Sequence, residues 1–323
     1  MSLIENLKKQ IRNKKSTIVF PEGTDSRVLR AAIRLNEDGD LRPIVLGKKD
    51  EIERLASFEN VNLGDLEIID PEDYNEFDSM VDAFVERRAG KATVEEGKKI
   101  LRDPNYFGTM LIYLDKADGM VSGAIHTTGD TVRPALQIIK TKKGISRVSG
   151  AFIMIRESHM LLMADCAINM DLDEDGLAEL AVVSEETARQ FGLEPKVAML
   201  SFSTKGSAKH ERVDMVRNAT EKAKALNPNM IIDGEMQFDA AYVKSVGAKK
   251  APNSPIKGDA NVFIFPNLES GNIGYKIAQR LGGFEAVGPV LQGLNKPVND
   301  LSRGTSEDEV YSLAIITAAQ AML

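Results

Sequence analysis

The sequence predicts an α/β protein with two domains, and three observations support that prediction. The chain has 323 residues, which is more than one hydrophobic core usually serves, because domains average about 100–200 residues. Short strand-like runs alternate with helical patterns, as in parallel sheets covered by helices. A polar joint with a glycine, residues 142–144, separates two such regions. A ligand-binding cleft is expected between two domains of this kind.

The first region extends to about residue 143 and begins with a strand, a helix and a second strand. Residues 17–20 form an apolar run, and residues 28–35 carry apolar side chains at helical spacing. Residues 43–46 are again continuously apolar, which is typical of a strand buried on both faces. The pattern continues with strands expected at 67–69 and 119–121 and a helical tract over 80–114 that Pro104 interrupts.

The second region begins at residue 144 and also alternates strands with helices. Residues 151–155 and 161–163 are apolar runs that start a second sheet. The apolar spacing of residues 306–322 predicts a closing helix. The remaining expected elements are strands at 197–200, 230–232 and 261–265 and helices near 174–191 and 209–226.

Composition and charge exclude several classes of function. Hydrophobic residues make up 43% and charged residues 28% of the chain, so most of it should fold. A net charge of −7 argues against nucleic acid as a partner. The single Cys166 excludes an internal disulfide, and residues 1–6 lack the basic stretch that opens a secretion signal. No window approaches the ~18 apolar residues of a membrane helix, so we expect a cytoplasmic protein without a membrane partner.

The densest group of chemistry-bearing residues is the segment 299–306, which leads into the closing helix. Backbone N–H groups at a helix start bind anions, and Arg303 can grip two oxygens of a phosphate at once. Gly304 allows a close approach of the backbone, and Ser302 offers a hydroxyl. The segment therefore predicts a phosphate site, although such loops are also common as solvated turns with a capping serine, here Ser306.

Glu309 has two competing interpretations. It stands three residues after Ser306, the position from which a capping-box carboxylate accepts the backbone N–H of the first residue. The helix dipole keeps such a carboxylate charged, which makes it a weaker base than a buried one. From the residues alone, capping is slightly favoured over proton abstraction.

The stretch 119–134 predicts a second anion site, because a strand passes through a glycine-rich polar loop into a helix. Arg133 is a second cation for the same phosphate, with a surface ion pair as the alternative. Ser122 and Thr128 are candidates for substrate binding. His126 is a candidate base, but the sequence gives it no fixed acidic partner, and such a histidine is more often a loop hydrogen-bonder.

Two loops of small residues, 251–258 and 267–274, flank the strand expected at 261–265. Open α/β sheets bind ligands beyond the carboxyl ends of their strands. This rule favours the second loop and makes Asn272 a candidate for substrate binding, with simple turn chemistry as the alternative.

The sequence predicts neither a metal site nor a permanently bound cofactor. His126, His159 and His210 lack ligand spacing, and there is no Cys-x-x-Cys. The segment 233–235, Asp-Gly-Glu, could hold a divalent ion but is more typical of a turn and cap. Cys166 adjoins an apolar strand and is expected to be a small buried residue rather than an acyl-carrying nucleophile. No Gly-x-Gly-x-x-Gly dinucleotide signature follows the first strand.

In their order along the chain, these motifs resemble the phosphate acetyltransferase family, also called phosphotransacetylases, from end to end. No single motif is specific, but their number and order make a chance match improbable. The matching pieces are residues 20–23, 121–126, 131–137, 164–167, 233–235, 251–254, 267–274 and 302–304.

The resemblance implies a fold of two α/β domains with the active site in the cleft between them, an isocitrate/isopropylmalate dehydrogenase-like architecture. It also implies that the last segment returns to the first domain. The expected domains are therefore 1–143 plus 295–323, and 144–294. A homodimer and a role in acetate metabolism are implied as well.

The family's functional positions carry over residue by residue. The acid that matches Glu309 is usually Asp and is proposed to deprotonate the thiol of coenzyme A, so this chain departs there by one methylene. Thr305 stands where relatives often carry Cys. We assign Ser302, Arg303, Glu309 and Arg133 to catalysis and Arg87, Ser122, His126, Thr128, Asn272 and Gly304 to substrate binding.

The expected reaction is reversible acetyl transfer between acetyl phosphate and coenzyme A, giving acetyl-CoA and inorganic phosphate by direct thiolate attack in a ternary complex. Coenzyme A is then a substrate rather than a resident cofactor. Three alternatives stay open. They are a phosphate butyryltransferase with a roomier acyl pocket, an NAD- and metal-dependent dehydrogenase of related fold, and a binding module without catalysis.

Overall fold

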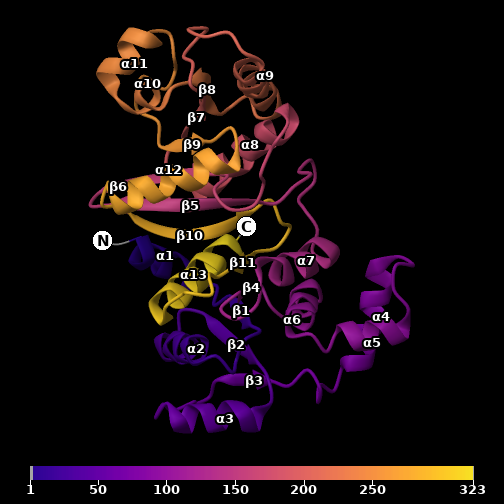
Figure 1. Ribbon diagram of the computed structural model, residues 1–323. Coiled ribbons are helices and arrows are strands. Elements are labelled where there is room, and N and C mark those ends of the chain that lie inside the picture. The colour runs from indigo at the N-terminus through magenta and orange to yellow at the C-terminus, as the bar shows by residue number, and fades with distance from the viewer. Residues whose placement is uncertain (1–2, 323) are drawn as a thin grey trace. The chain divides into compact units, whose positions relative to one another are not determined.

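The computed structural model describes residues 3–322 and divides the chain into two compact units. Unit 1 comprises the residues up to Thr141 together with those from Leu294 onward, and unit 2 comprises Lys142–Gly293. Each unit contains one sheet with helices packed against it (Figure 1). The predicted α/β class is confirmed in both units, and the expected cleft between them stays a prediction.

The sheet of unit 1 is wholly parallel, as the alternation of strands and helices predicted. Its five strands stand in the order β11-β4-β1-β2-β3. The central strand is continuously apolar from Ile18 to Phe20, and these side chains are fully buried. The strands are β1 Thr17–Phe20, β2 Arg42–Leu46, β3 Glu67–Ile69, β4 Gly119–Ser122 and β11 Val298–Asp300.

Eight helices of unit 1 lie within residues 3–322. The long helical tract breaks where expected, because Asp103 caps a new helix and Pro104 occupies its first position, where a missing N–H costs nothing. The helices are α1 Leu3–Ile11, α2 Ser26–Asp38, α3 Lys49–Phe58, α4 Phe77–Arg88, α5 Val94–Ile100, α6 Pro104–Tyr113, α7 Thr128–Ile138 and α13 Glu307–Gln320.

The closing helix α13 packs against α1, α2 and β4 of unit 1. Its polar anchor is Tyr311, whose hydroxyl accepts a hydrogen bond of 2.7 Å from Lys8 and donates one to Asp38. The last segment therefore completes the unit that the first segment starts.

The strand order of unit 1 places three loops at one edge of its sheet. From β1 the chain builds the sheet outward through β2 and β3, and then crosses to the other side of β1 to add β4 and β11. The order therefore reverses between β1 and β4. In open α/β sheets, ligands bind beyond the carboxyl ends of the strands at such a point.

Unit 2 has a mixed sheet in the order β10-β5-β6-β9-β7-β8. Strand β5 pairs antiparallel with both β6 and β10, and the other pairs are parallel. The strands are β5 Ser149–Arg156, β6 His159–Ala164, β7 Lys196–Leu200, β8 Ile231–Met236, β9 Val262–Ile264 and β10 Glu285–Gln292. The helices are α8 Glu174–Gln190, α9 Glu211–Leu226, α10 Phe238–Tyr242, α11 Lys244–Lys250 and α12 Leu268–Arg280. Over residues 3–322, no helix combines the length and the apolar character that a membrane crossing requires.

Candidate active site

Three loops that follow neighbouring strands of unit 1 form the candidate site. They are residues 21–25 after β1, residues 123–127 after β4 and residues 301–306 after β11. Because these strands are parallel and adjacent, their carboxyl ends meet at one edge of the sheet. We call these three loops the rim.

Arg27, in the first turn of α2, contacts all three loops of the rim. Its Nη1 donates to the carbonyl oxygens of Arg303 at 2.9 Å and Thr305 at 3.0 Å. Its Nη2 donates to the carbonyl oxygen of Ala124 at 3.0 Å, and the Asp25 carboxylate holds the same guanidinium at 2.7 Å. One side chain therefore fixes all three loops relative to one another.

The loop after β4 binds an internal carboxylate. The side chain of Glu22 is fully buried and accepts four hydrogen bonds of 2.8–3.0 Å from consecutive backbone N–H groups, those of residues 123–126. Backbone donors arranged in this way suit an anion. The sequence indicated a phosphate there; in the structure, Glu22 occupies these donors instead.

His126 also contacts Glu22. Its Nδ1 lies 2.7 Å from Oε1 of Glu22, and its side chain is 25% exposed. The statement that His126 has no fixed acidic partner, made from the sequence, is therefore wrong. The partner stands 104 residues away along the chain, too far for a local pattern to reveal it.

Asp300, the last residue of β11, is a second buried acid of the rim. It is 3% exposed, and its Oδ2 accepts a hydrogen bond of 2.6 Å from the hydroxyl of Thr128. Its Oδ1 has no partner among residues 3–322. Burial disfavours the ionised form and raises the pKa of Asp300 to about 6. The predicted site residue Thr128 is therefore hydrogen-bonded to Asp300.

The segment 302–304 is exposed on the rim. The turn is closed by a hydrogen bond of 2.9 Å from the N–H of Thr305 to the carbonyl oxygen of Ser302. The N–H of Gly304 lies 3.3 Å from Oγ of Ser302. The side chain of Arg303 makes no hydrogen bond or ion pair within the described chain, so its guanidinium is available to a ligand.

Arg133 is the second available cation. It is exposed on α7 and, like Arg303, has no hydrogen bond or ion pair within the range 3–322. The guanidinium of Arg133 lies close to Gly129 in the first turn of α7. Its Nη2 would be 3.9 Å from a Cβ atom built on Gly129. Both predicted catalytic arginines therefore belong to unit 1 and remain unpaired.

Glu309 caps its own helix. Its Oε2 accepts hydrogen bonds from the backbone N–H of Ser306 at 2.8 Å and from Oγ1 of Thr305 at 3.2 Å. Oγ of Ser306 accepts the N–H of Glu309 in return, which completes the capping box. The predicted capping role is confirmed, and the role as a base stays a prediction.

Three predicted site residues lie away from the rim surface, and their assignment to substrate binding stays a prediction. Ser122 is buried at the end of β4, and its Oγ has no partner among residues 3–322. Arg87 donates to the carbonyl oxygen of Ile138 at 2.7 Å, at the far end of α7, about 15 Å from its start. Asn272 belongs to α12 of unit 2, where it donates to the carbonyl oxygen of Cys166.

In unit 2, the carboxylates of the segment 233–235 contact cations of the protein. Lys205 donates to Asp233, and Nε of Arg217 lies 3.2 Å from Glu235. Burial alone would raise the pKa of Glu235. Hydrogen bonds to its carboxylate, among them one from the N–H of Gly206, outweigh the effect of burial, so the pKa of Glu235 is lowered. Among residues 3–322, no three His, Cys, Asp or Glu side chains could hold a metal ion.

Cys166 is fully buried, as predicted. Burial raises the pKa of its thiol well above the usual value, which disfavours the thiolate that an acyl-cysteine mechanism requires. Unit 2 also contains a pocket of about 560 Å³ at the ends of β7 and β9. Its lining includes Phe202, Phe238, Phe265, Met215, Arg212 and Ser270.

Glu22 and Arg27 are site residues that the sequence did not predict, and Asp300, although it lies in the predicted phosphate segment 299–306, was not singled out there. Glu22 and Asp300 stand within two residues of the carboxyl end of a strand, which is the signal that could have found them. Arg27 carries no such signal, because its partners are backbone carbonyl oxygens of distant loops.

Unit 1 combines a parallel sheet with a glycine-containing turn at its strand ends and two unpaired arginines. This combination is typical of an α/β enzyme that binds an anionic substrate. Residues 2–318 match the family described as "Phosphate acetyl/butaryl transferase". The chain belongs to this family and is an acyltransferase, specifically a phosphate acetyltransferase.

Relatives and solved structures agree with that assignment. The chain is 58% identical to phosphate acetyltransferase of Bacillus subtilis (strain 168), with 99% of each chain covered. It is similar to the crystal structure of a phosphotransacetylase from Streptococcus pyogenes, with 59% identity, a TM-score of 0.97 and 100% and 99% of the two chains covered.

A more distant likeness concerns the fold alone. A putative 4-hydroxythreonine-4-phosphate dehydrogenase from Salmonella typhimurium is 13% identical with a TM-score of 0.58, covering 95% of this chain and 99% of the other. The expected dehydrogenase-like architecture is therefore confirmed.

Proposed function

We propose that this phosphate acetyltransferase transfers the acetyl group between acetyl phosphate and coenzyme A by direct attack of the thiolate in a ternary complex. The observation that supports this mechanism best is the pair of unpaired, exposed arginines of unit 1, Arg303 and Arg133. Such cations suit a phosphorylated substrate. The only cysteine is buried as a thiol, which supports direct transfer over an acyl-cysteine intermediate.

Arg303 and Arg133 stabilise negative charge on the departing phosphate and on the tetrahedral oxyanion, and Ser302 donates a hydrogen bond. Each such donor contributes roughly 3–4 kcal/mol in a favourable case. Gly304 leaves room for the phosphate beside the backbone. The sequence-based hypothesis gives the thiol proton to Glu309, although one of its oxygens already accepts two hydrogen bonds.

The reaction is tested by mixing the purified protein with acetyl phosphate and coenzyme A and following the thioester absorbance, with no metal or nucleotide added. Acetyl-CoA should accumulate, and adding inorganic phosphate to acetyl-CoA should run the reaction in reverse. A preparation that binds coenzyme A but forms no thioester would support a binding module instead.

The acyl chain needs its own comparison. The family includes enzymes of both acetyl and butyryl type, and a hydrophobic pocket discriminates one methylene by only about 1–3 kcal/mol. We propose acetyl on the strength of the 58% identity to a named acetyltransferase. A higher kcat/KM for butyryl phosphate than for acetyl phosphate would overturn that preference.

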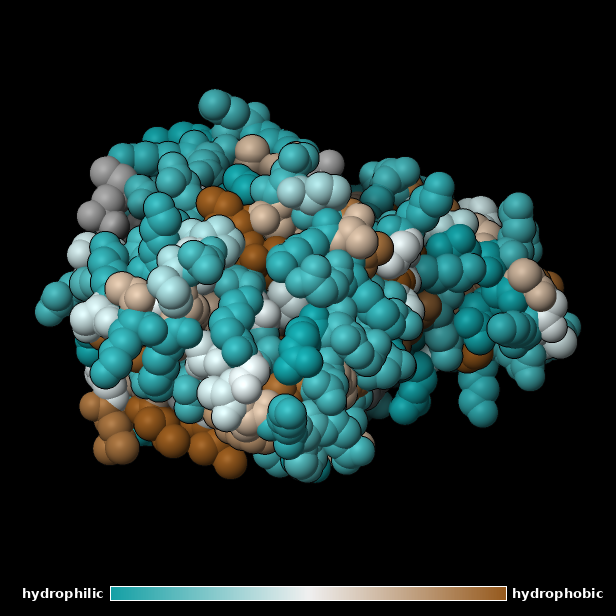
Figure 2. Space-filling view, turned by 90° about the horizontal axis from the view of Figure 1, so that it is seen from above, coloured by the Kyte–Doolittle hydropathy of each residue, from teal (hydrophilic) through white to brown (hydrophobic). Residues whose placement is uncertain are grey.

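We further propose a cytoplasmic homodimer that acts in acetate metabolism. Figure 2 shows a face that is mostly hydrophilic, with hydrophobic residues gathered in a patch at its lower left. Ile273 and Ile277 of α12, together with Leu281 directly after it, form an exposed apolar stripe at helical spacing, which supports a subunit interface. Sedimentation equilibrium should give twice the mass of the chain, and Ile277→Asp should shift it toward the monomer.

A further inference from the structure

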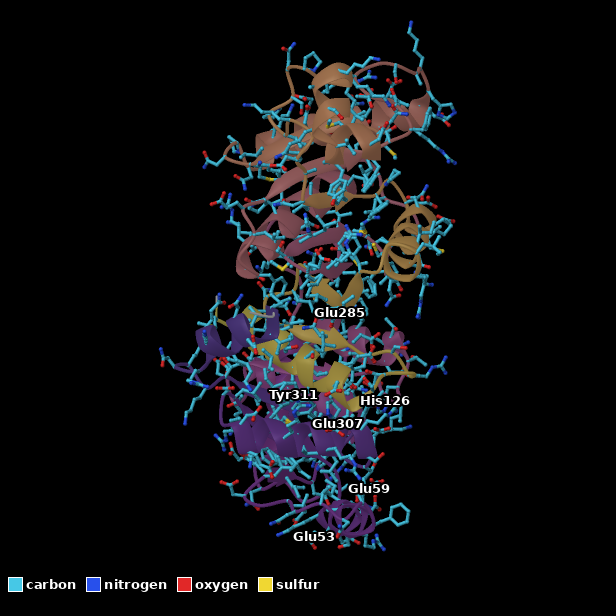
Figure 3. The ribbon with its side chains drawn as sticks, turned by 90° about the vertical axis from the view of Figure 1, so that its left-hand side faces the viewer. Glu53, Glu59, His126, Glu285, Glu307 and Tyr311 are labelled. Carbon is cyan, nitrogen blue, oxygen red and sulfur yellow. The ribbon has the colours of Figure 1, made fainter. Side chains whose placement is uncertain are left out.

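The pocket of unit 2 lies where a ligand site is expected in a sheet of this kind. Strands β7 and β9 are adjacent and parallel, so their carboxyl ends meet at one edge. From β7 the chain runs through α9 to β8, whereas from β9 it runs through α12 to β10, at the opposite end of the sheet. Figure 3 labels Glu285, the first residue of β10. The two connections therefore diverge, and residues from both loops line the pocket.

The pocket has room for a molecule of more than one ring. Its volume is about 560 Å³, within the range of roughly 300–1,000 Å³ that is usual for ligand sites. A single benzene ring fills a cavity of only about 150 Å³. All of the lining residues belong to unit 2, and none belongs to the rim. The roles proposed for the rim arginines therefore do not account for this pocket.

Two phenylalanines are open to water at the pocket. Phe202, in the loop after β7, is 58% exposed, and Phe238, the first residue of α10, is 44% exposed. Phe265 also lines the pocket but is buried. Exposed apolar side chains beside a cavity are typical of a ligand-binding surface. Because the faces of aromatic rings stack on other flat rings, these residues suit an aromatic ligand.

The wall of the pocket also carries two opposite charges. Arg212, in the first turn of α9, and Asp171, just before α8, are both exposed. Neither side chain makes a hydrogen bond or an ion pair among residues 3–322, so the two do not pair with each other. A free guanidinium can donate two hydrogen bonds to a phosphate. A free carboxylate accepts hydrogen bonds from hydroxyl or amino groups.

From this combination of aromatic rings, one cation and one acceptor, we infer that the pocket binds a nucleotide. The base packs against the rings of Phe202 and Phe238, and the phosphate pairs with Arg212. Asp171 accepts hydrogen bonds from the ribose hydroxyls or from an amino group of the base. Two sources share this chemistry, namely a free mononucleotide and the adenine nucleotide portion of coenzyme A.

The test is isothermal titration calorimetry of the full chain with AMP and with adenosine, which lacks the phosphate. The variants are Arg212→Gln and Phe238→Ala, and thermal unfolding reports whether each is folded. Arg54→Gln and Phe58→Ala are the matched controls, because both residues are exposed on α3 of unit 1, away from the lining of the pocket.

We expect Arg212→Gln to bind AMP at least about tenfold more weakly than the wild type. Its affinity for adenosine should be unchanged, because only the phosphate contacts Arg212. Phe238→Ala should weaken AMP and adenosine alike, by about tenfold, because both lose the stacking of the base. Both control variants should match the wild type.

The KM for coenzyme A distinguishes the two sources. If the pocket binds a free nucleotide, Arg212→Gln and Phe238→Ala should leave this KM unchanged. If it binds the adenine portion of coenzyme A, the KM should rise by about the factor by which AMP binding falls. Thioester formation by the wild type tests the proposed function separately, so a failure of the reaction and a failure of the pocket are recognised independently.

Three results would overturn the inference. The first is no binding of millimolar AMP by the wild type, which would leave Phe202 and Phe238 as a surface for another protein chain. The second is an affinity for AMP that neither pocket variant changes. The third is a loss of AMP binding in Arg303→Ala alone, because the nucleotide would then bind to unit 1.

Discussion

The hydroxyl of Thr128 donates a hydrogen bond of 2.6 Å to Oδ2 of Asp300, and the other carboxylate oxygen of Asp300 is buried without a partner among residues 3–322. A carboxylate in this position is poorly solvated, so ionisation of Asp300 lowers the stability of the folded protein.

Asp300→Asn should change the pH dependence of stability. The pKa of Asp300 is raised from 3.8 to about 6 by burial, so between these values the folded state binds the proton more tightly than the unfolded state. The contribution of Asp300 to stability is therefore present below pH ~4 and lost as pH rises through ~6, by about 3 kcal/mol.

The measurement is urea unfolding of wild type and variant at about pH 3.5, 5 and 7.5, which brackets the window between the unfolded pKa of 3.8 and the folded pKa of about 6. Asp300→Asn should gain stability over the wild type as pH rises. Asp50→Asn is the control, because Asp50 is exposed and should give a difference that does not grow. A constant difference for Asp300→Asn would contradict the burial argument.

Gly123→Ala should destabilise unit 1 and abolish activity. A Cβ at Gly123 would lie 2.5 Å from Oδ1 of Asp300 and 2.7 Å from the backbone N and O of Leu301. The backbone there has φ +111°, which disfavours any side chain.

The matched control is Gly64→Ala, with φ +57° and no atom within 4 Å of the new Cβ. Gly64→Ala should lower the free energy of unfolding by about 1–2 kcal/mol, and Gly123→Ala should cost about 1–3 kcal/mol more because of overpacking. Equal losses in chemical denaturation would show that the loops after β4 and β11 are not tightly packed.

Arg303→Ala should lower kcat/KM for acetyl phosphate by about 100-fold or more, without changing the unfolding temperature. The side chain is exposed and makes no hydrogen bond or ion pair within the described residues, so the fold does not depend on it. Arg54→Ala removes another exposed arginine, one that pairs only with Asp50 on its own helix, and should leave activity unchanged. Near-normal turnover by Arg303→Ala would remove Arg303 from the site.

Glu309→Gln and Glu309→Ala separate capping from catalysis. Glutamine can still accept the N–H of Ser306, so Glu309→Gln should keep its stability, whereas Glu309→Ala should lose about 0.5–2 kcal/mol. We expect the kcat of Glu309→Gln to fall by less than about tenfold. A loss of 100-fold or more in a fully stable protein, about 2.7 kcal/mol in transition-state energy, would instead support Glu309 as the base.

The accuracy of the fold prediction followed the apolar content of each element more than its length. The prediction of a loop at 267–274 was wrong, because α12 begins at Leu268, whereas the three-residue strands β3 and β9 were predicted. The strand predicted at residues 17–20 has the same bounds as β1, because every residue in it favours a strand. Strand β11 was missed because it has three residues, two of them the polar Asn299 and Asp300. Strand β10 was missed because Gly288 and Pro289 interrupt it and read as a turn.

Within the site, contacts between residues close in sequence could be predicted, and contacts between distant residues could not. The capping role of Glu309 is a contact across three residues and follows from the sequence. The pairing of Glu22 with the loop at 123–126 spans more than 100 residues and depends on β1 and β4 being neighbours. A single sequence contains no signal for such a pairing, so the occupied backbone donors and the partner of His126 emerged only from the structure.

The return of β11 and α13 to unit 1 affects the order in which the enzyme can assemble. Unit 2 is one continuous segment and can complete its core while synthesis is still under way, because domains generally fold as units during translation. Unit 1 must wait with an open sheet edge beside β4 until residues 298–320 have been made. Since Ser302 and Arg303 lie in that segment, an unfinished chain should have no activity, and the exposed edge of β4 is where a nascent chain is most open to aggregation.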